Sequence, residues 1–128
     1  MPTPSVSKLT PVLVVTAIEP SLEFWEKRLG FSRTVEVPHE NALGFVILVK
    51  DGVELMFQSA ASVLADLGSS AGGESAALFI EVGDLAAIEQ ALAGYPLTMP
   101  RRTTFYGMHE IGVKEPGGHF VVFAQPTQ

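Results

Sequence analysis

The sequence predicts an α+β domain made of two tandem units, each a strand, a helix and three further strands. Near the C-terminus, residues 105–126 contain two apolar runs around the turn cluster Glu115-Pro116-Gly117-Gly118, which is typical of a β-hairpin. Residues 43–57 contain a weaker copy, in which two apolar runs flank Lys50-Asp51-Gly52. A strand-like run and then a helix-like run precede each hairpin, so the pattern indicates an internal duplication.

The first unit is expected to hold a strand at 9–17, a helix at 20–29, a strand at 31–37 and the hairpin at 43–57. Pro11 cannot donate to a β-ladder, so the first strand should lie at the edge of its sheet. Trp25 and Leu29 recur at helical spacing and are expected in the core, and Gly30 ends the helix.

The second unit is expected to hold a strand at 76–82, a helix around 85–92, a strand at 97–102 and the C-terminal hairpin. Asp84 is the predicted N-cap of this helix and Gly94 its end. Residues 60–73 are small and polar and predict a short helical piece followed by a flexible linker. The chain is thus one domain, 1–128, with modules at 9–58 and 76–125 joined by a linker at 59–75.

Composition narrows the class of function. The formal net charge is −6 and the eight Lys and Arg residues are scattered, so nucleic acid is not an expected partner. The absence of cysteine excludes disulfides, thiolate chemistry and Cys-ligated zinc. The sequence shows neither a signal-peptide core nor an apolar run of membrane-spanning length, which predicts a soluble cytoplasmic protein without a membrane partner.

Strand alternation predicts which side chains share a sheet face. In strand 76–82, Leu78 and Ile80 should face the helix, whereas Ala77 and Phe79 face away from it. Apolar residues expected on the faces that point away from the helices are Val46, Leu48, Met56, Phe120 and Val122. A sheet that is apolar on both sides must be covered by the other module, a second subunit or a ligand.

Two segments carry a family resemblance: PVLVVTAIEPSLEFWEKRLGF at 11–31 and FYGMHEIGVKEPGGHFVVFAQ at 105–125. They resemble the opening strand–helix–LGF element and the closing YG-x-x-E … DP-x-G hairpin of the glyoxalase / bleomycin-resistance / dioxygenase group, the vicinal oxygen chelate superfamily. The resemblance implies two βαβββ modules that form a curved mixed sheet around a cavity, commonly in a homodimer. This fold hosts many chemistries, so it predicts function less well than structure.

Metal enzymes of this group carry one ligand on the first strand and one on the last strand of each module. The matching positions here are Thr10, Met56, Ala77 and Val122. None of these side chains is a good ligand for a hard divalent cation, so neither a metal nor another cofactor is expected. A two-residue register error would bring Glu54 into the fourth-strand position, but one carboxylate does not make a site.

The candidate ligand-binding residues are Met56, Phe79, Phe105, Tyr106, Glu110, Val122 and Glu54. Glu110 matches the acidic residue of the YG-x-x-E motif, and two hypotheses stay open for it: pairing with Arg101 or Arg102, or contact with a ligand. Phe105 and Tyr106 precede a glycine at a strand entrance, where their rings could line a cavity mouth.

The three histidines are not expected to be catalytic. His39 is predicted to be solvated in a polar loop, and His119 to be surface-exposed beside its turn. His109 is predicted to be a hydrogen-bonded residue near the sheet rim.

The leading functional hypothesis is a metal-free small-molecule binding protein of the bleomycin-resistance type. Such a protein would act as a homodimer in antibiotic resistance, sequestering a planar or amphipathic compound in an apolar pocket. The alternative is a metal-dependent lyase, isomerase or dioxygenase, and a third hypothesis is a structural or regulatory module. The sequence leaves open whether the modules pair within one chain or across a swapped dimer.

Overall fold

The computed structural model describes residues 4–5, 8–67 and 75–127. Within these residues, eight strands form two four-stranded sheets with the orders β1-β4-β3-β2 and β5-β8-β7-β6. The first sheet consists of β1 (Val12–Val15), β2 (Ser32–His39), β3 (Ala42–Lys50) and β4 (Val53–Ser59). The second consists of β5 (Ala77–Glu81), β6 (Leu97–Thr103), β7 (Met108–Lys114) and β8 (Phe120–Pro126). The first strand of each sheet is an edge strand parallel to its neighbour, and the other pairs are antiparallel.

The two halves therefore repeat one topology, and the predicted α+β fold of two βαβββ modules is confirmed. The edge position expected for the Pro11 strand is also confirmed, since β1 pairs only with β4 among the described strands. The short helical piece predicted after the first hairpin is α2 (Ala60–Leu67). Most of the predicted linker, residues 68–74, lies outside the described residues.

The first helix is partly a π-helix, whose turns contain more residues than those of the predicted α-helix. It begins as α1 (Glu19–Leu22) and continues as a π-helix, η1 (Glu23–Arg28), in which the Leu29 N–H donates to the carbonyl of Phe24, five residues earlier, at 3.2 Å. Trp25 and Leu29 are buried as expected. The wide turn buries Phe24 together with Trp25, whose rings meet edge to face at 5.2 Å between centroids.

The second helix, α3 (Leu85–Ala91), follows its predicted limits closely. The Asp84 carboxylate accepts a hydrogen bond from the Ala87 N–H at 3.3 Å, which confirms it as the N-cap. Gly94 has a φ of +80° and follows the helix, as expected of a helix-ending glycine. Leu85 and Leu92 are buried against the sheet.

The first hairpin corrects part of the predicted face assignment. Asp51 and Gly52 both have positive φ, so the turn has two residues and pairs Lys50 with Val53. This register puts the even-numbered residues of β3 opposite the odd-numbered residues of β4. Val46 and Leu48 consequently face Phe57 and Leu55 on the helix side and are fully buried, which makes their predicted position on the opposite face wrong.

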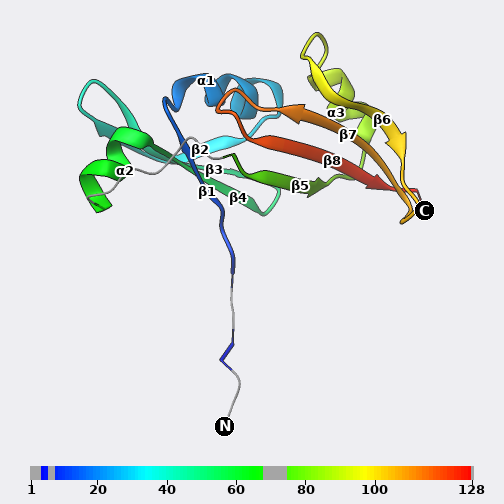
Figure 1. Cartoon of the computed structure of the whole chain (residues 1–128), viewed down its shortest axis with the longest axis horizontal. Helices are drawn as coiled ribbons and strands as arrows, with labels where there is room; N and C mark the ends of the chain where they lie inside the picture. The colour runs from blue at the N-terminus through cyan, green and yellow to red at the C-terminus, as the bar shows by residue number, and fades with distance from the viewer. Residues whose placement is uncertain (1–3, 6–7, 68–74, 128) are drawn as a thin grey trace.

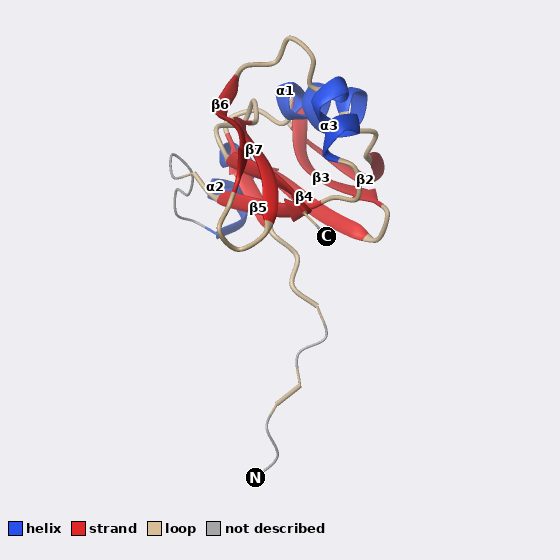
Figure 2. Cartoon of the chain, turned by 90° about the vertical axis from the view of Figure 1, so that its right-hand side faces the viewer, coloured by secondary structure: helices blue, strands red, loops and turns tan. Residues whose placement is uncertain are grey.

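One apolar core joins the two modules. The first helix (α1 and η1) and α3 lie on one side of the two sheets, and buried side chains from the two halves form a single cluster (Figures 1 and 2). Phe24 of η1 packs on Tyr95, which follows α3, with 5.1 Å between the ring centroids. The Arg28 guanidinium donates to the carbonyls of Ala91 and Ala93 at the end of α3. The modules thus pack against each other within one chain.

A buried polar cluster closes the junction between the modules. Glu115 is buried, and one carboxylate oxygen accepts hydrogen bonds from Ser21 Oγ at 2.9 Å and Trp25 Nε1 at 3.1 Å. The other oxygen accepts from the His119 backbone N–H at 3.2 Å. The prediction that His119 is surface-exposed is wrong: the side chain is only 3% exposed. The turn after β7 folds under η1 and carries both residues into the interior.

Candidate functional site

The candidate site consists of the two sheet faces that point away from the helices, called the open faces below. On the second sheet, Phe79 lies beside Val122, and Val122 lies beside Gly112. Phe79 is 55% exposed, and Val122 is half-buried. On the first sheet, Met56 lies between Val12 and Ile47 and is half-buried. These rows confirm the predicted alternation in β1, β4, β5 and β8 and leave large apolar side chains uncovered in the single chain.

The four positions that correspond to metal ligands provide no metal-binding set. Thr10 leads into β1, Ala77 begins β5, and Met56 and Val122 lie on the open faces of β4 and β8. Across the described part of the chain, no cluster of three or more His, Cys, Asp or Glu side chains is placed to hold a metal ion. The residues present therefore do not fit the metal centre that the family's enzymes use.

Glu54 is the carboxylate on the open face of the first sheet, and it is held by neighbours in sequence-distant segments. Lys8 Nζ donates to it at 2.7 Å and Thr10 Oγ1 at 3.3 Å. The hydrogen bond from Lys8, with the attraction of the ammonium charge, holds the pKa of Glu54 below its ordinary value. Glu54 is thus ionised at neutral pH and already paired.

Glu110 is a buried carboxylate on the open face of the second sheet, and its side chain is only 1% exposed. Arg102 donates from Nε at 3.1 Å and from Nη2 at 3.0 Å to Oε1, and Tyr106 OH donates to Oε2 at 2.6 Å. Of the two hypotheses for Glu110, pairing with an arginine is what the structure contains, and the partner is Arg102. Arg101 instead pairs with Glu89 on the surface.

The Glu110 cluster fixes an aromatic pair at the tip of the β6–β7 hairpin. The hydrogen bond to Glu110 raises the pKa of the Tyr106 phenol, which stays protonated as a donor. Phe105 packs edge to face on Tyr106 with 5.2 Å between centroids and is fully exposed. Arg102 is half-exposed beside them. The tip therefore offers two rings and a guanidinium to solvent, with Glu110 as their buried anchor.

The structure separates the predicted site residues into three groups. Phe79 and Val122 are neighbours on the second sheet; Phe105, Tyr106 and Glu110 meet at the β6–β7 tip; Met56 and Glu54 lie on the first sheet. Sequence reasoning missed Lys8 as the partner of Glu54. It also missed Glu115, because a carboxylate in a turn followed by Pro-Gly-Gly gives no sign in the sequence that it is buried.

The other two histidines are not part of this site. His109 Nδ1 lies 2.9 Å from Thr103 Oγ1 across the β6–β7 pair, as expected of a hydrogen-bonded histidine at the rim. His39 is half-buried and is the last residue of β2, so its predicted place in a loop is wrong. The hairpin between β2 and β3 is tighter than expected, because Glu40 adopts a φ of +57° and reverses the chain there.

Comparison with known protein families agrees with this architecture. The model of the Glyoxalase/Bleomycin resistance protein/Dioxygenase superfamily matches residues 8–123. The chain belongs to this superfamily. No curated protein matches it in sequence. Of the helices in the described part of the chain, none has the length and apolar character needed to cross a membrane.

Solved structures show the same fold. A glyoxalase / bleomycin resistance protein / dioxygenase from Nocardioides is 22% identical, with a TM-score of 0.76 over 98% of this chain and 87% of that one. A lactoylglutathione lyase from Agrobacterium tumefaciens is 10% identical, with a TM-score of 0.76 over 96% of each chain. A bleomycin-binding protein from Streptomyces verticillus, complexed with copper(II)-bleomycin, is 20% identical, with a TM-score of 0.64 over 94% of this chain and 97% of that one. The superfamily fold thus serves both a lyase and a binding protein, and the choice between them depends on this chain's own residues.

Proposed function

We propose that this member of the superfamily is a small-molecule binding protein that works without a metal, sequestering a planar or amphipathic compound against its apolar open faces. The observation that carries the proposal is the chemistry of the four ligand-equivalent positions, Thr10, Met56, Ala77 and Val122, together with the lack of a metal-binding cluster in the described residues. A face built this way can bury apolar surface of a ligand but cannot polarise a substrate through an ion.

The carboxylates favour binding over catalysis. Glu54 and Glu110 lie on different sheets, and each is already hydrogen-bonded to a cationic side chain. Exposed Phe79, Phe105 and Tyr106 supply flat apolar surface on which a planar compound can stack. The structural similarity to a bleomycin-binding protein makes bleomycin the first ligand to test, with a role in antibiotic resistance.

The same open faces support a homodimer. Val12, Val35 and Val37 on the first sheet and Phe79 and Phe120 on the second are each at least 40% exposed in the single chain. A second copy laid over them would turn two shallow faces into walls of an enclosed cavity. Sedimentation of Phe79→Asp against the matched exposed-surface control Leu64→Asp on α2 tests this: the first variant should be monomeric and the second dimeric. Equal masses for both variants would contradict the dimer.

The first test of the binding function is elemental analysis, which determines whether the purified protein contains a metal. Protein purified without an affinity tag or chelator should contain no stoichiometric nickel, zinc, manganese or iron, and chelator should leave its melting temperature unchanged. A stoichiometric metal that is lost to chelator would instead favour the metal-dependent enzyme.

A thermal-shift titration with bleomycin and with the planar cation proflavine then tests ligand binding. Stabilisation by either compound should be lost in Phe79→Ser and kept in Leu64→Ser, whose side chain is about as exposed as that of Phe79. Stabilisation that is equal in both variants would place binding elsewhere on the molecule. Stabilisation by neither compound would remove both of these ligand candidates.

A further inference from the structure

The junction between the modules is called the seam below. It has two ends, which the internal duplication makes equivalent in topology. At one, the turn of the second module (Pro116–Gly118) meets β1; at the other, the turn of the first module (Lys50–Gly52) meets the end of β5. The duplication relates Val15 to Val82 and Gly118 to Gly52. It therefore allows the two ends of the seam to be compared residue by residue.

The first end contains large and polar side chains. Glu115, His119 and Trp25 fill it and hydrogen-bond across it. The hollow that remains above them has a volume of about 280 Å³, and its lining is largely glycine and polar residues: Gly117, Gly118, Thr16, Ser75 and Lys114. At the second end, the strand registers place Lys50, Val53 and Leu92 at the corresponding positions. Val53 and Leu92 are smaller than His119 and Trp25 and are apolar, and Lys50 pairs with Asp51 at the rim, so the buried hydrogen bonds of the first end have no counterpart here.

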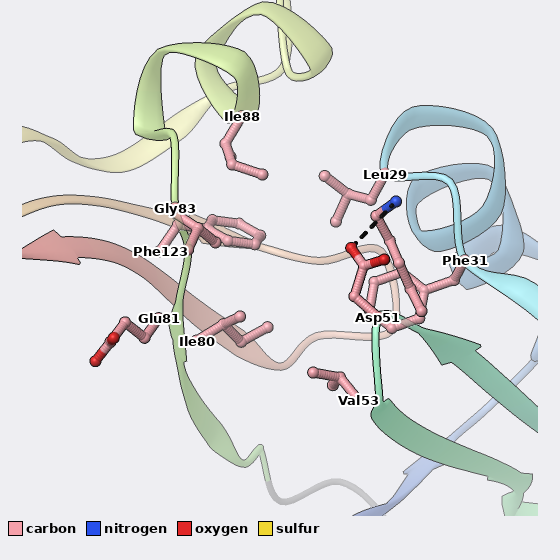
Figure 3. Close-up of a pocket in the computed structure, with 11 residues that line it drawn as sticks. Leu29, Phe31, Asp51, Val53, Ile80, Glu81, Gly83, Ile88 and Phe123 are labelled. Carbon is pink, nitrogen blue, oxygen red and sulfur yellow. Dashed lines mark ion pairs between the residues drawn. The ribbon is translucent and has the colours of Figure 1, made fainter.

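The second end is a pocket of about 290 Å³, called the seam pocket. Its walls come from both modules (Figure 3). The apolar lining residues are Leu29, Phe31, Val53, Ile80, Ile88 and Phe123. In Figure 3, Ile88 points down from α3, Val53 lies opposite it, and Phe123 and Ile80 form the wall between them. The volume lies at the lower limit of ordinary ligand pockets and cannot admit a helix or strand of a partner protein.

Two of the three charged residues at the rim form an ion pair with each other. Lys50 Nζ lies 3.7 Å from Asp51 Oδ2, and a dashed line marks this ion pair in Figure 3. The third charged residue, Glu81, directs its carboxylate away from the pocket (Figure 3). A charged ligand would have to leave water for apolar walls without gaining a counter-charge that is not already paired.

We propose that the seam pocket is a second binding site, separate from the open faces, for a small uncharged aromatic or branched aliphatic molecule. Its ligand bridges the two modules, because Val53 and Phe31 belong to the first and Ile80 and Ile88 to the second. Burial against these side chains supplies the affinity, and the size of the pocket limits the ligand to about two rings.

Toluene, benzoate and benzylamine, which differ mainly in charge, are suitable probes. Methyl-labelled protein titrated with toluene should show saturable chemical-shift changes at Ile80, Ile88 and Val53. Benzoate and benzylamine should bind about tenfold more weakly or worse, because their charges oppose entry into an apolar pocket. A charged probe that binds as well as toluene would overturn the proposed ligand class.

Substitutions that fill the seam pocket test whether toluene binds there. Val53→Phe and Ile88→Phe fill the pocket from opposite walls, and each should weaken toluene binding about tenfold or more. Leu64→Phe adds the same ring elsewhere and should leave binding unchanged, as should Phe79→Ser, which alters the open face and does not line the seam pocket. Tryptophan fluorescence of Trp25 establishes that each variant is folded. The proposal is overturned if toluene causes no saturable shift, or if both folded filling variants bind it as the unaltered protein does.

Discussion

His119 joins the two sheets through its ring, with Nε2 lying 3.0 Å from the carbonyl oxygen of Val14 in β1. The other ring nitrogen, Nδ1, accepts the backbone N–H of Ala76, which leads into β5, at 2.8 Å. Because Nδ1 accepts, the proton must be on Nε2, and the ring is the neutral tautomer that donates to Val14. One buried side chain thus hydrogen-bonds the edge strands of both modules.

Replacing this ring should weaken the whole fold. His119→Ala leaves the Ala76 N–H and the Val14 carbonyl without their partner and opens a cavity, which should lower the free energy of unfolding by about 2–4 kcal/mol. Urea denaturation measures the loss. The control is His39→Ala, at the end of β2, which should change stability by no more than about 0.5 kcal/mol. Similar losses in the two variants would show that His119 does not link the modules.

Much of the fold could be predicted because local signals and long-range packing agree. Asp84 caps a helix, Asp-Gly makes a two-residue turn, and Trp25 has helical spacing; each of these features depends on neighbours in the chain. The face assignment failed at Val46 and Leu48, because parity across a hairpin depends on the number of residues in the turn and not on the strand composition.

The burial of Glu115 and His119 could not be predicted for a different reason. Their partners, Ser21, Trp25 and Val14, lie about ninety residues or more away in the chain. A turn-forming sequence such as Glu-Pro-Gly-Gly is ordinarily at the surface. Only the packing of one module on the other puts this turn inside. The open-face residues were predictable by strand alternation, whereas the seam pocket depends on which side chains meet at the second end.

At Gly117 the second module lies close against β1 of the first. A Cβ at this position would lie 2.4 Å from Val15 Cγ1 and 2.6 Å from Glu115 Oε2, closer than real Cβ atoms come. Gly117→Ala should therefore push the turn away from β1 and lower the free energy of unfolding by about 1–3 kcal/mol, measured by urea denaturation. At Gly83, the same Cβ would meet no atom within 4 Å. Gly83→Ala is thus the matched control, and a loss there as large as at Gly117 would argue against a steric cause.

Arg101 and Arg102 are adjacent but have different partners, which makes them a matched pair. Arg102→Met leaves the buried Glu110 carboxylate with Tyr106 as its remaining side-chain donor. Because the Arg102 side chain is itself half-exposed, we expect a loss of about 1–3 kcal/mol in the free energy of unfolding. Arg101→Met breaks only the surface pair with Glu89 and should cost at most about 1 kcal/mol.

The double variant Arg102→Met/Glu110→Gln separates loss of the ion pair from loss of side-chain packing. Neutralising the carboxylate should recover part of the stability lost in Arg102→Met, because a buried amide tolerates the missing guanidinium better than a buried charge does. Thermal or urea denaturation of the four proteins in this cycle gives the coupling energy. Additive losses would contradict an energetic link between Arg102 and Glu110.

Tyr106 should titrate above its ordinary pKa because it donates to Glu110. The chain has two tyrosines, and burial raises the pKa of the other, Tyr95, so the measurement is made in a Tyr95→Phe background. Ultraviolet absorbance of the tyrosinate should then rise only at a pH above about 10, the ordinary value. In Tyr95→Phe/Glu110→Gln, the neutral amide no longer opposes ionisation, and the transition should move to lower pH.

The same shift has a consequence for stability. A tyrosine whose pKa is raised in the folded state contributes stability that is fully present below its unfolded pKa, near 10, and is lost as the pH rises through the folded value. Urea denaturation of the Tyr95→Phe protein should therefore show a steeper loss of stability above about pH 10 than that of Tyr95→Phe/Tyr106→Phe. Parallel pH profiles, or a Tyr106 transition that Glu110→Gln leaves unmoved, would mean that the phenol is free in solution and that the β6–β7 tip is not anchored by Glu110.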